Sequence, residues 1–380
     1  SPAAPRARRM RPAVQRGTLG GFLLLPILAR SLAFSRPKRP PVAMEDDVHA
    51  VIEAYKPHRR HPRLYSPWSN DMFDPAFLEL VQEVRNGATA EALVRAGRME
   101  VVTEGVFSFP MLADATCDMI MEEADNYKAT GLPVRRPNSM NRYGLILATI
   151  GMSPAIEDFQ QRLLQPLAAL LFPIEGEEFG GHHTFLVQYK ASEDLGLDMH
   201  TDDSDVTFNV CLGKEFQGAG LTFCGMMGAE DHRQFSATFQ HSKGRAVVHL
   251  GNKRHGADDI QSGERVNMIV WNHNHAYRSS AAYQHRMHFY QPEDGEPDRR
   301  CLSYTHDRDY EAYKEIPPNV QAPPARRNGQ RGWCPPPPFC YDGMDPVAPR
   351  IVERRTRELQ AGRPDGGQQG QQGQPPDAEL

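Results

Sequence analysis

The arrangement of apolar and polar residues along the chain changes near residue 180. Before that point, apolar residues recur at helical spacing in residues 44–55, 74–97, 114–131 and 153–172. The Asp-Pro pair at residue 74 is typical of a helix start, and Gly131 is typical of a helix end. The pattern therefore predicts a mainly helical region over residues 44–180.

After residue 180, apolar and polar residues alternate in short runs that are separated by glycine-containing turns. A period of two is the pattern of β-strands. The alternation is found in residues 183–190, 196–202, 206–213, 220–225, 236–241, 245–251 and 265–272. Many short strands after a helical region predict an α+β fold, with a double-sheet jelly roll over residues 181–275 and flanking helices.

Both ends of the chain differ from this middle part. Residues 1–43 are rich in Arg, and their apolar stretch at 20–29 is too short to predict a membrane span. A basic leader with a short apolar run is typical of targeting peptides, so residues 10–35 predict secretory or organelle targeting, with a cytoplasmic protein as the alternative. Residues 276–361 are predicted to form an irregular Pro- and Arg-rich extension, and residues 362–380 a disordered tail.

Composition narrows the class of protein without fixing its activity. The 380 residues are 39 % hydrophobic and 24 % charged, which is typical of a soluble globular protein. The formal net charge of −5 gives no reason to expect nucleic-acid binding. The six cysteines lack CxxC spacing and are too few for a disulfide scaffold, so we expect mostly reduced core thiols. Cys334 and Cys340, which flank a proline run, are the pair that the sequence offers for a disulfide.

The segment DMHTDDSDVTFNV, residues 198–210, contains the first candidate for chemistry. His200 and Asp202 are two positions apart, so in a strand their side chains share a face. A third metal ligand has to come from farther along the chain, where His249 and His255 compete. His255 is preferred because Arg265 follows ten positions later at the start of an apolar strand. We expect this strand to lie beside the histidine, so that the arginine side chain can enter the same cavity.

The residue types of this set indicate a kind of metal site. Two histidines and one carboxylate leave open positions on a metal, which favours non-haem Fe(II) chemistry with O₂. A 2-oxo acid can chelate through two such positions, and the planar guanidinium of Arg265 suits its far carboxylate. Two alternatives remain open: a cupin-like metalloenzyme that does not use 2-oxoglutarate, and a non-catalytic jelly-roll binding module.

Residues 100–275 resemble the prolyl/lysyl-hydroxylase-type Fe(II)/2-oxoglutarate dioxygenases, in particular the 2-oxoglutarate and iron-dependent oxygenase domain-containing protein 2 group. The resemblance is carried by RPNSMNRYG, HHTFLVQY, LDMHTDDSDVTFNVCLGKEFQGAGLTF, GRAVVHLGNKRHGA and SGERVNMIVW. It implies a double-stranded β-helix in which His200, Asp202 and His255 bind Fe(II). It also implies that Arg265 pairs with the distal carboxylate of 2-oxoglutarate and that Tyr189 contacts this co-substrate.

The resemblance also suggests a reaction and a substrate class. It implies hydroxylation of a lysyl or prolyl side chain in a protein, with release of succinate and CO₂ and with ascorbate as a further cofactor. Beyond the metal centre, no side chain is expected to act in catalysis.

Further polar residues are candidates for the cavity wall. Thr207 and Asn209 share a strand face, although ordinary strand alternation explains them equally well. Asp202, Asp203 and Asp205 together suggest an acidic mouth for a cationic side chain such as lysine, with solvated acids as the alternative. The polar loop at residues 135–144 is either a cover over the site or a structural loop.

Overall fold

The computed structural model describes residues 47–138, 140–285, 294–303 and 309 of the chain. The expected targeting leader, the tail, most of the Pro- and Arg-rich extension, and the pair Cys334 and Cys340 lie outside the described residues. No helix within the described ranges is long and apolar enough to cross a membrane.

The helices begin and end close to the positions that the sequence predicts. Asp74 caps α3 by accepting a hydrogen bond from Ala76 N at 2.8 Å, and Pro75 occupies the first turn. Residues 153–172, predicted as one helix, form two α-helices joined by a π-helical turn at Gln160–Leu164. The α-helices are α2 (Val48–Tyr55), α3 (Pro75–Arg85), α4 (Ala90–Arg95), α5 (Asp114–Ala129), α6 (Ser153–Phe159), α7 (Gln165–Leu171), α8 (His275–Arg278) and α9 (Ala281–His285).

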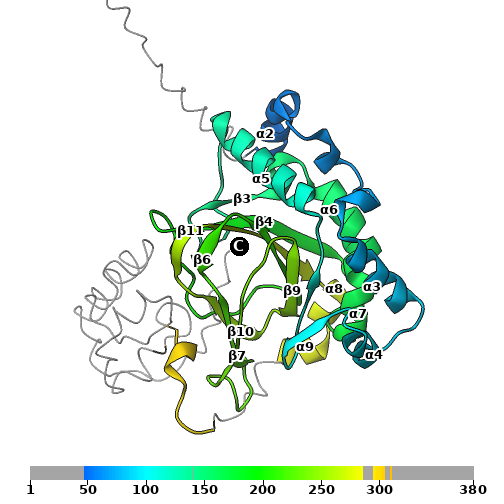
Figure 1. The fold of residues 1–380 in the computed structure, drawn as a ribbon, viewed down its shortest axis with the longest axis vertical. Helices are drawn as coiled ribbons and strands as arrows, with labels where there is room; N and C mark the ends of the chain where they lie inside the picture. Colours follow the sequence, from blue (N-terminus) through cyan, green and yellow to red (C-terminus); the bar gives the residue numbers. More distant parts are fainter. Residues whose placement is uncertain (1–46, 139, 286–293, 304–308, 310–380) are drawn as a thin grey trace, which may run out of the picture. The chain divides into compact units, whose positions relative to one another are not determined.

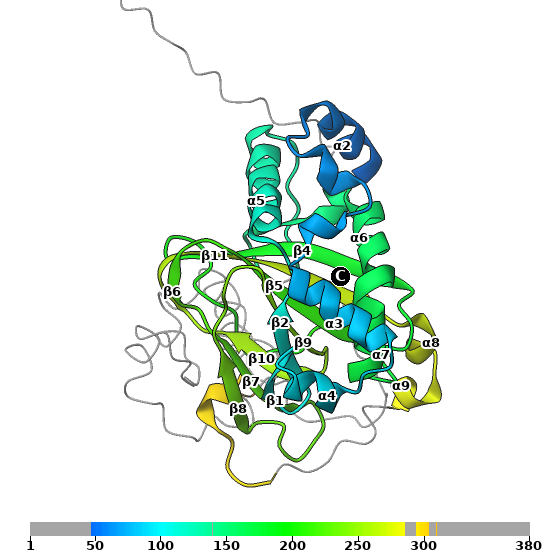
Figure 2. The same ribbon diagram turned by 45° about the vertical axis from the view of Figure 1, so that its right-hand side comes forward.

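A large antiparallel sheet forms the centre of the described structure, and α3, α5, α6 and α7 lie along one side of it (Figures 1 and 2). Its strand order is β1-β2-β9-β5-β11-β4-β3, and β6 pairs with one end of β11. The strands are β1 (Glu100–Thr103), β2 (Val106–Pro110), β3 (Gly144–Ile146), β4 (Gly181–Lys190), β5 (Val206–Gly213), β6 (Phe216–Gly218), β9 (Arg245–Leu250) and β11 (Ile260–His273). The region predicted as mainly helical thus also supplies β1, β2 and β3.

Alternation along the strands decides what each face of the large sheet contacts. On β11, Val266, Met268 and Val270 belong to one apolar cluster with the helices. Ile269 belongs to a second cluster on the opposite face. The odd-numbered positions that include Arg265 therefore point away from the helices.

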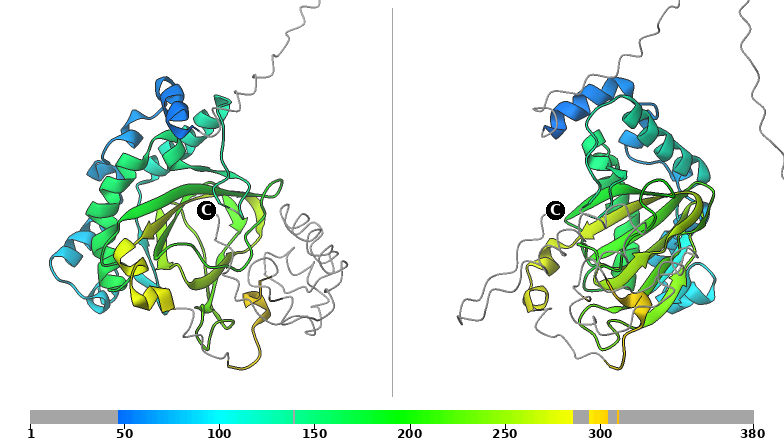
Figure 3. Two further views of the ribbon diagram at one scale, coloured as in Figure 1. Left: turned by 180° about the vertical axis from the view of Figure 1, so that it is seen from behind. Right: turned by 90° about the vertical axis from the view of Figure 1, so that its left-hand side faces the viewer.

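A small sheet faces the second side of the large one (Figure 3). Its order is β10-β7-β8, with bounds β7 (Leu221–Met226), β8 (Phe235–Phe239) and β10 (Lys253–Ala257). Phe223 and Phe239 of the small sheet share an apolar cluster with Phe185 and Ile269 of the large one. Two antiparallel sheets packed in this way, with helices outside, confirm the expected α+β double-stranded β-helix.

Two expectations about strands were wrong. Residues 196–202 do not form a strand, because only His200 makes an isolated bridge, to His255. Strand β10 carries His255, but it lies in the small sheet and not beside β11, which lies in the large one. Arg265 therefore faces the histidine from the opposite sheet.

The expectation of mostly reduced cysteines also needs correction. Cys224 on β7 and Cys301 form a disulfide with a Cα–Cα distance of 5.9 Å. Cys117 and Cys211 are buried free thiols, as expected.

Candidate metal centre

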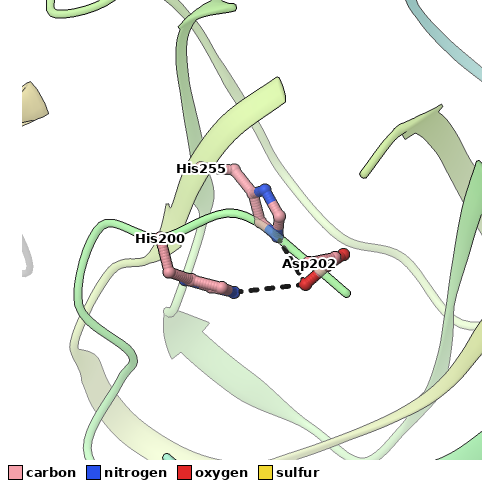
Figure 4. Close-up of side chains that lie close together, drawn as sticks. All are labelled: His200, Asp202 and His255. Carbon is pink, nitrogen blue, oxygen red and sulfur yellow. Dashed lines mark ion pairs between the residues drawn. The ribbon is translucent and has the colours of Figure 1, made fainter. Parts of the chain in front are cut away.

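Three side chains with metal-binding atoms meet between the sheets: His200, Asp202 and His255 (Figure 4). Asp202 Oδ1 lies 3.4 Å from His200 Nε2 and 3.5 Å from His255 Nε2. One ligand atom from each residue lies within 4.8 Å of the others. All three side chains are less than 10 % exposed. Two imidazoles and one carboxylate are the donor set of the facial triad that binds non-haem Fe(II).

Main-chain hydrogen bonds hold the two histidines in place. His200 N donates to His255 O at 2.8 Å, and His255 N donates to His200 O at 3.0 Å. Asp202 N donates to Gly251 O at 2.9 Å, where a Cβ on the glycine would come within 1.9 Å of Ser204 O. The HTD segment thus leaves strand geometry and crosses close to the β9–β10 turn, which brings Asp202 beside both histidines.

The hydrogen bonds of each ligand residue fit a bound metal ion. His200 Nδ1 donates to Asp198 O at 2.7 Å, and His255 Nδ1 donates to Lys253 O at 2.8 Å. In the neutral rings this places the lone pair on Nε2, where the ligand atoms converge. Thr207 Oγ1 donates to Asp202 Oδ2 at 2.7 Å and leaves Oδ1 directed towards the histidines.

Electrostatics favour an ionised carboxylate in this group. Without a metal ion, burial alone raises the pKa of Asp202, but His255 and His200 in their protonated form outweigh burial and hold this pKa well below its usual value; a bound cation would replace those protons. The aspartate thus keeps the negative charge that a divalent cation requires.

His249, the competing histidine, lies next to the triad without joining it. Its ring centroid is 4.5 Å from that of His255, and its side chain is fully buried. Burial lowers the pKa of His249 to about 3, so the ring is neutral. Its Nε2 has no hydrogen-bond partner among the described residues.

A cavity of about 830 Å³ opens beside the triad and reaches Arg265. Arg265 pairs directly with Tyr189 across β11 and β4, and its guanidinium carbon lies 4.6 Å from the centre of the tyrosine ring. Arg265 Nη1 donates to Ala219 O, while its Nε has no hydrogen-bond partner among the described residues. Both predicted co-substrate residues therefore lie in the same cavity as the triad.

Other predicted wall residues also line this cavity. Thr207 and Asn209 face it from β5, and Arg136, Asn138 and Asn141 face it from the polar loop. Asn141 Nδ2 donates to the Tyr189 hydroxyl at 3.3 Å, so the loop is connected to the cavity wall.

The mouth is less acidic than the sequence suggests. Arg278 Nη1 pairs with Asp203 Oδ1 at 2.9 Å, and Arg278 Nε pairs with Asp205 Oδ2, also at 2.9 Å. Asp205 is buried and also accepts a hydrogen bond from Asn274 N at 2.6 Å. One arginine thus pairs with both acids and offsets one of their two negative charges, which weakens the case for an acid-selected lysine.

An aromatic wall was not anticipated. His183, Phe185 and Trp271 line the cavity on neighbouring strands, and the Phe185 and Trp271 rings meet edge to face at 5.0 Å. Trp271 Nε1 is buried without a hydrogen-bond partner in the described part of the chain. The signal was present in the sequence, because Trp271 and Arg265 have the same parity on one strand.

Known proteins match the chain over the helical region and beyond it. Residues 51–177 match the profile of the OGFOD2-like domain. A human protein named 2-oxoglutarate and iron-dependent oxygenase domain-containing protein 2 is 32 % identical over 248 residues, which cover 64 % of this chain and 70 % of the human protein. The Arabidopsis thaliana 2-oxoglutarate and iron-dependent oxygenase domain-containing protein CP2 is 34 % identical over 232 residues, which cover 57 % of this chain and 56 % of the Arabidopsis protein.

More distant matches have known hydroxylase names. The mouse procollagen-lysine,2-oxoglutarate 5-dioxygenase 1 is 26 % identical over 186 residues, which cover 46 % of this chain and 24 % of the mouse protein. A solved prolyl hydroxylase from Trichoplax adhaerens, in complex with a hypoxia inducible factor peptide, is 13 % identical with a TM-score of 0.39. It covers 53 % of this chain and 96 % of its own.

Proposed function

Because the chain belongs to the 2-oxoglutarate and iron-dependent oxygenase domain-containing protein 2 family, and is a 2-oxoglutarate-dependent dioxygenase, we propose that His200, Asp202 and His255 bind its iron. The convergence of these three ligand atoms within 4.8 Å is the observation that carries the proposal. When bound, Fe(II) couples the decarboxylation of 2-oxoglutarate by O₂ to hydroxylation of the substrate, with release of succinate and CO₂.

Arg265 and Tyr189 are proposed to bind the co-substrate. The buried guanidinium is the cation that a distal carboxylate needs, and charge-assisted hydrogen bonds are strong where water is excluded. The Tyr189 ring packs against Arg265 and restricts its orientation, while its hydroxyl is held by Asn141. Neither residue is required to transfer a proton.

The proposed substrate is a lysyl or prolyl side chain in a protein or peptide. The name of the mouse procollagen-lysine relative supports a protein substrate. The aromatic wall offers an apolar surface beside the triad, which suits the ring of proline. Because Arg278 pairs with Asp203 and Asp205, the case for lysine rests on the relative and not on an acidic mouth.

Two further expectations belong to this proposal. Ascorbate is proposed to keep the iron reduced, as the resemblance to prolyl and lysyl hydroxylases implies. Secretory or organelle targeting is proposed over a cytoplasmic location, because the Cys224–Cys301 disulfide is the kind of bond that persists in oxidising compartments. Fractionation of cells that express the full chain with a C-terminal tag tests the location.

The direct test is succinate formation from 2-oxoglutarate by purified protein that is loaded anaerobically with Fe(II) and then exposed to O₂. Wild type is compared with His255→Ala and Arg265→Ala, and with His275→Ala, which removes an exposed histidine outside the cavity. We expect succinate from wild type and His275→Ala, and its loss in the other two variants. If the wild-type protein binds iron but neither binds nor consumes 2-oxoglutarate, the proposed role of Arg265 is contradicted and the cupin-like alternative is favoured.

Peptide arrays of lysyl and prolyl sequences then test the substrate class. Hydroxylation detected as a mass gain on one residue type decides between them, and activity on free small molecules alone contradicts a protein substrate.

A further inference from the structure

A short segment near residue 300 lies against the small sheet, on the side away from the cavity. It comprises residues 298–303 and Asp309, and we call it the clamp. Its single helical turn, Arg299–Cys301, lies beside β7 and β8 in Figure 2. Cys301, Ser303 and Asp309 are fully buried, so the clamp is packed into the protein and not laid over its surface.

The clamp is bonded covalently to the strand that pairs with the ligand strand. Cys301 is joined to Cys224 on β7. The residue before Cys224 is Phe223, which pairs with His255 across β7 and β10. The disulfide therefore anchors the clamp one residue away from the pairing partner of a proposed iron ligand.

A buried ion network joins the clamp to the neighbour of His255 in the sequence. Arg254 Nη2 donates to Cys301 O at 2.8 Å and lies 3.2 Å from Asp309 Oδ2. Asp309 Oδ1 accepts from Arg233 Nη2 at 2.6 Å. Because strand neighbours point to opposite faces, Arg254 enters the clamp while His255 faces the cavity.

A second connection leads from the clamp to His200. Ser303 Oγ donates to Asp198 Oδ2 at 2.9 Å, and Ser303 N donates to Asp309 Oδ2 at 2.6 Å. Asp198 in turn accepts the Nδ1 hydrogen of His200 through its main-chain carbonyl. The clamp thus contacts the supports of both histidines.

We propose that the clamp positions His200 and His255 for metal binding, and that the Cys224–Cys301 disulfide locks it in place. The inference rests on the proposed iron ligands. The clamp residues lie outside residues 51–177, which match the family domain. Groups that orient metal ligands contribute strongly to metal affinity, and here they are supplied by a segment far away in sequence.

The lock is set when the chain folds, since both sulfurs are buried afterwards. The two thiols lose two electrons and two protons to a disulfide oxidant by thiol–disulfide exchange, and that oxidant leaves as two thiols. A chain that folds with Cys224 and Cys301 reduced has the same triad but a clamp held only by noncovalent contacts. We therefore expect its metal affinity to be lower.

Titration of metal-free full-length protein with Co(II), followed by its visible absorption bands, tests the inference without turnover. Cys301→Ser removes the lock, and Ser303→Ala removes the hydrogen bond to Asp198 while the disulfide stays. We expect each to weaken Co(II) binding by about tenfold and to change the band pattern. Cys117→Ser is the matched control, because it removes a buried cysteine far from the site and should leave both readouts unchanged.

Each outcome has a defined meaning. Wild-type affinity and bands in Ser303→Ala overturn the positioning role, and the same result in Cys301→Ser overturns the role of the disulfide. An equal loss in Cys117→Ser also overturns the inference, because general destabilisation then explains it. If Cys301→Ser does not fold, Ser303→Ala decides alone.

A separate variant tests the foundation. His200→Ala should lose Co(II) binding; if it binds like wild type, the proposed ligand set is wrong whatever the clamp variants show.

Discussion

The large and small sheets enclose one cavity, but different contacts cover their outer faces. Even-numbered residues of β11, such as Met268, pack against the helices in a broad apolar cluster. The small sheet instead meets the clamp through a disulfide and the buried Arg254–Asp309 pair. Apolar cover stabilises through its area and tolerates small shifts, whereas ion pairs and covalent bonds depend on geometry and on solution conditions.

The two sheets also differ in the proposed functional residues that they carry. The large sheet carries Arg265 and Tyr189, the proposed co-substrate residues, and the small sheet carries His255, a proposed iron ligand. One face of the small sheet joins the apolar cluster between the sheets through Phe223 and Phe239, and its other face contacts the clamp. We therefore expect the affinity for 2-oxoglutarate to depend on residues of the large sheet, and the affinity for metal to depend on the small sheet and its clamp.

The largest effect on activity is expected on the large-sheet side, in Arg265→Ala. Loss of charge-assisted hydrogen bonds to a buried carboxylate should raise the KM for 2-oxoglutarate by about a hundredfold. Affinity for Co(II) should stay near that of wild type, because Arg265 does not contact the triad. Arg265→Lys keeps the charge but not the planar fork and should fall between the two. A parallel loss of metal affinity would contradict the division between the sheets.

Asp309→Asn should strongly destabilise the small-sheet side. The substitution removes the negative charge that lies between two buried guanidinium groups, Arg233 and Arg254. It should therefore lower the free energy of unfolding by roughly 3–5 kcal/mol. Chemical denaturation measures this loss. Asp158→Asn, which breaks the partly exposed pair with Arg162, is the control and should cost less than about 1 kcal/mol. Equal costs would mean that the buried network adds no special support.

A smaller effect is expected for Thr207 of β5, which donates a hydrogen bond to Asp202. Thr207→Val removes the hydroxyl that orients Asp202 from the large sheet, and should weaken Co(II) binding by about tenfold. Thr207→Ser keeps the hydroxyl and should bind like wild type. If both variants bind alike, the hydrogen bond does not orient the ligand.

At neutral pH the smallest effect is expected for His232, a buried neighbour of Arg254, because its contribution to stability changes only at lower pH. Burial and then the charge of Arg254 lower its pKa from 6.5 to about 3. Between these two values His232 binds a proton in the unfolded chain but not in the folded chain. The folded state therefore loses stability as pH falls from 6.5 towards 3. In His232→Gln, the slope of unfolding free energy against pH over this range should shrink by about one proton. His275→Gln, at an exposed position, is the control; an equal change there would refute the assignment.

The sequence predicted four central strands of the large sheet well because their pattern is local, but it missed β1, β2 and β3 in the region predicted as helical. Strands β4, β5, β9 and β11 coincide closely with alternating runs, since each packs one face towards the helices and turns the other towards the space between the two sheets. The same alternation placed Arg265 on the cavity side.

In the small sheet, β7 and β8 also coincide with predicted runs, but β10 was missed because its contacts are distant in sequence. All five residues of β10 are buried, yet KRHGA has no apolar alternation, and Arg254 is compatible with burial only because Asp309 lies beside it. The HTD segment was predicted as strand, but main-chain bonding of Asp202 to Gly251 bends it out of register. Residues 77 positions apart form the disulfide, and no local pattern indicates this pairing.

The reciprocal main-chain bonds between His200 and His255 have a consequence for how a metal enters. Because the backbone itself fixes their spacing, both imidazoles stay close together before any ion arrives. Capture of the ion then costs little conformational entropy, since the HTD segment and β10 need no reordering. The amide hydrogens of these two residues should accordingly exchange slowly with solvent deuterium even in metal-free protein.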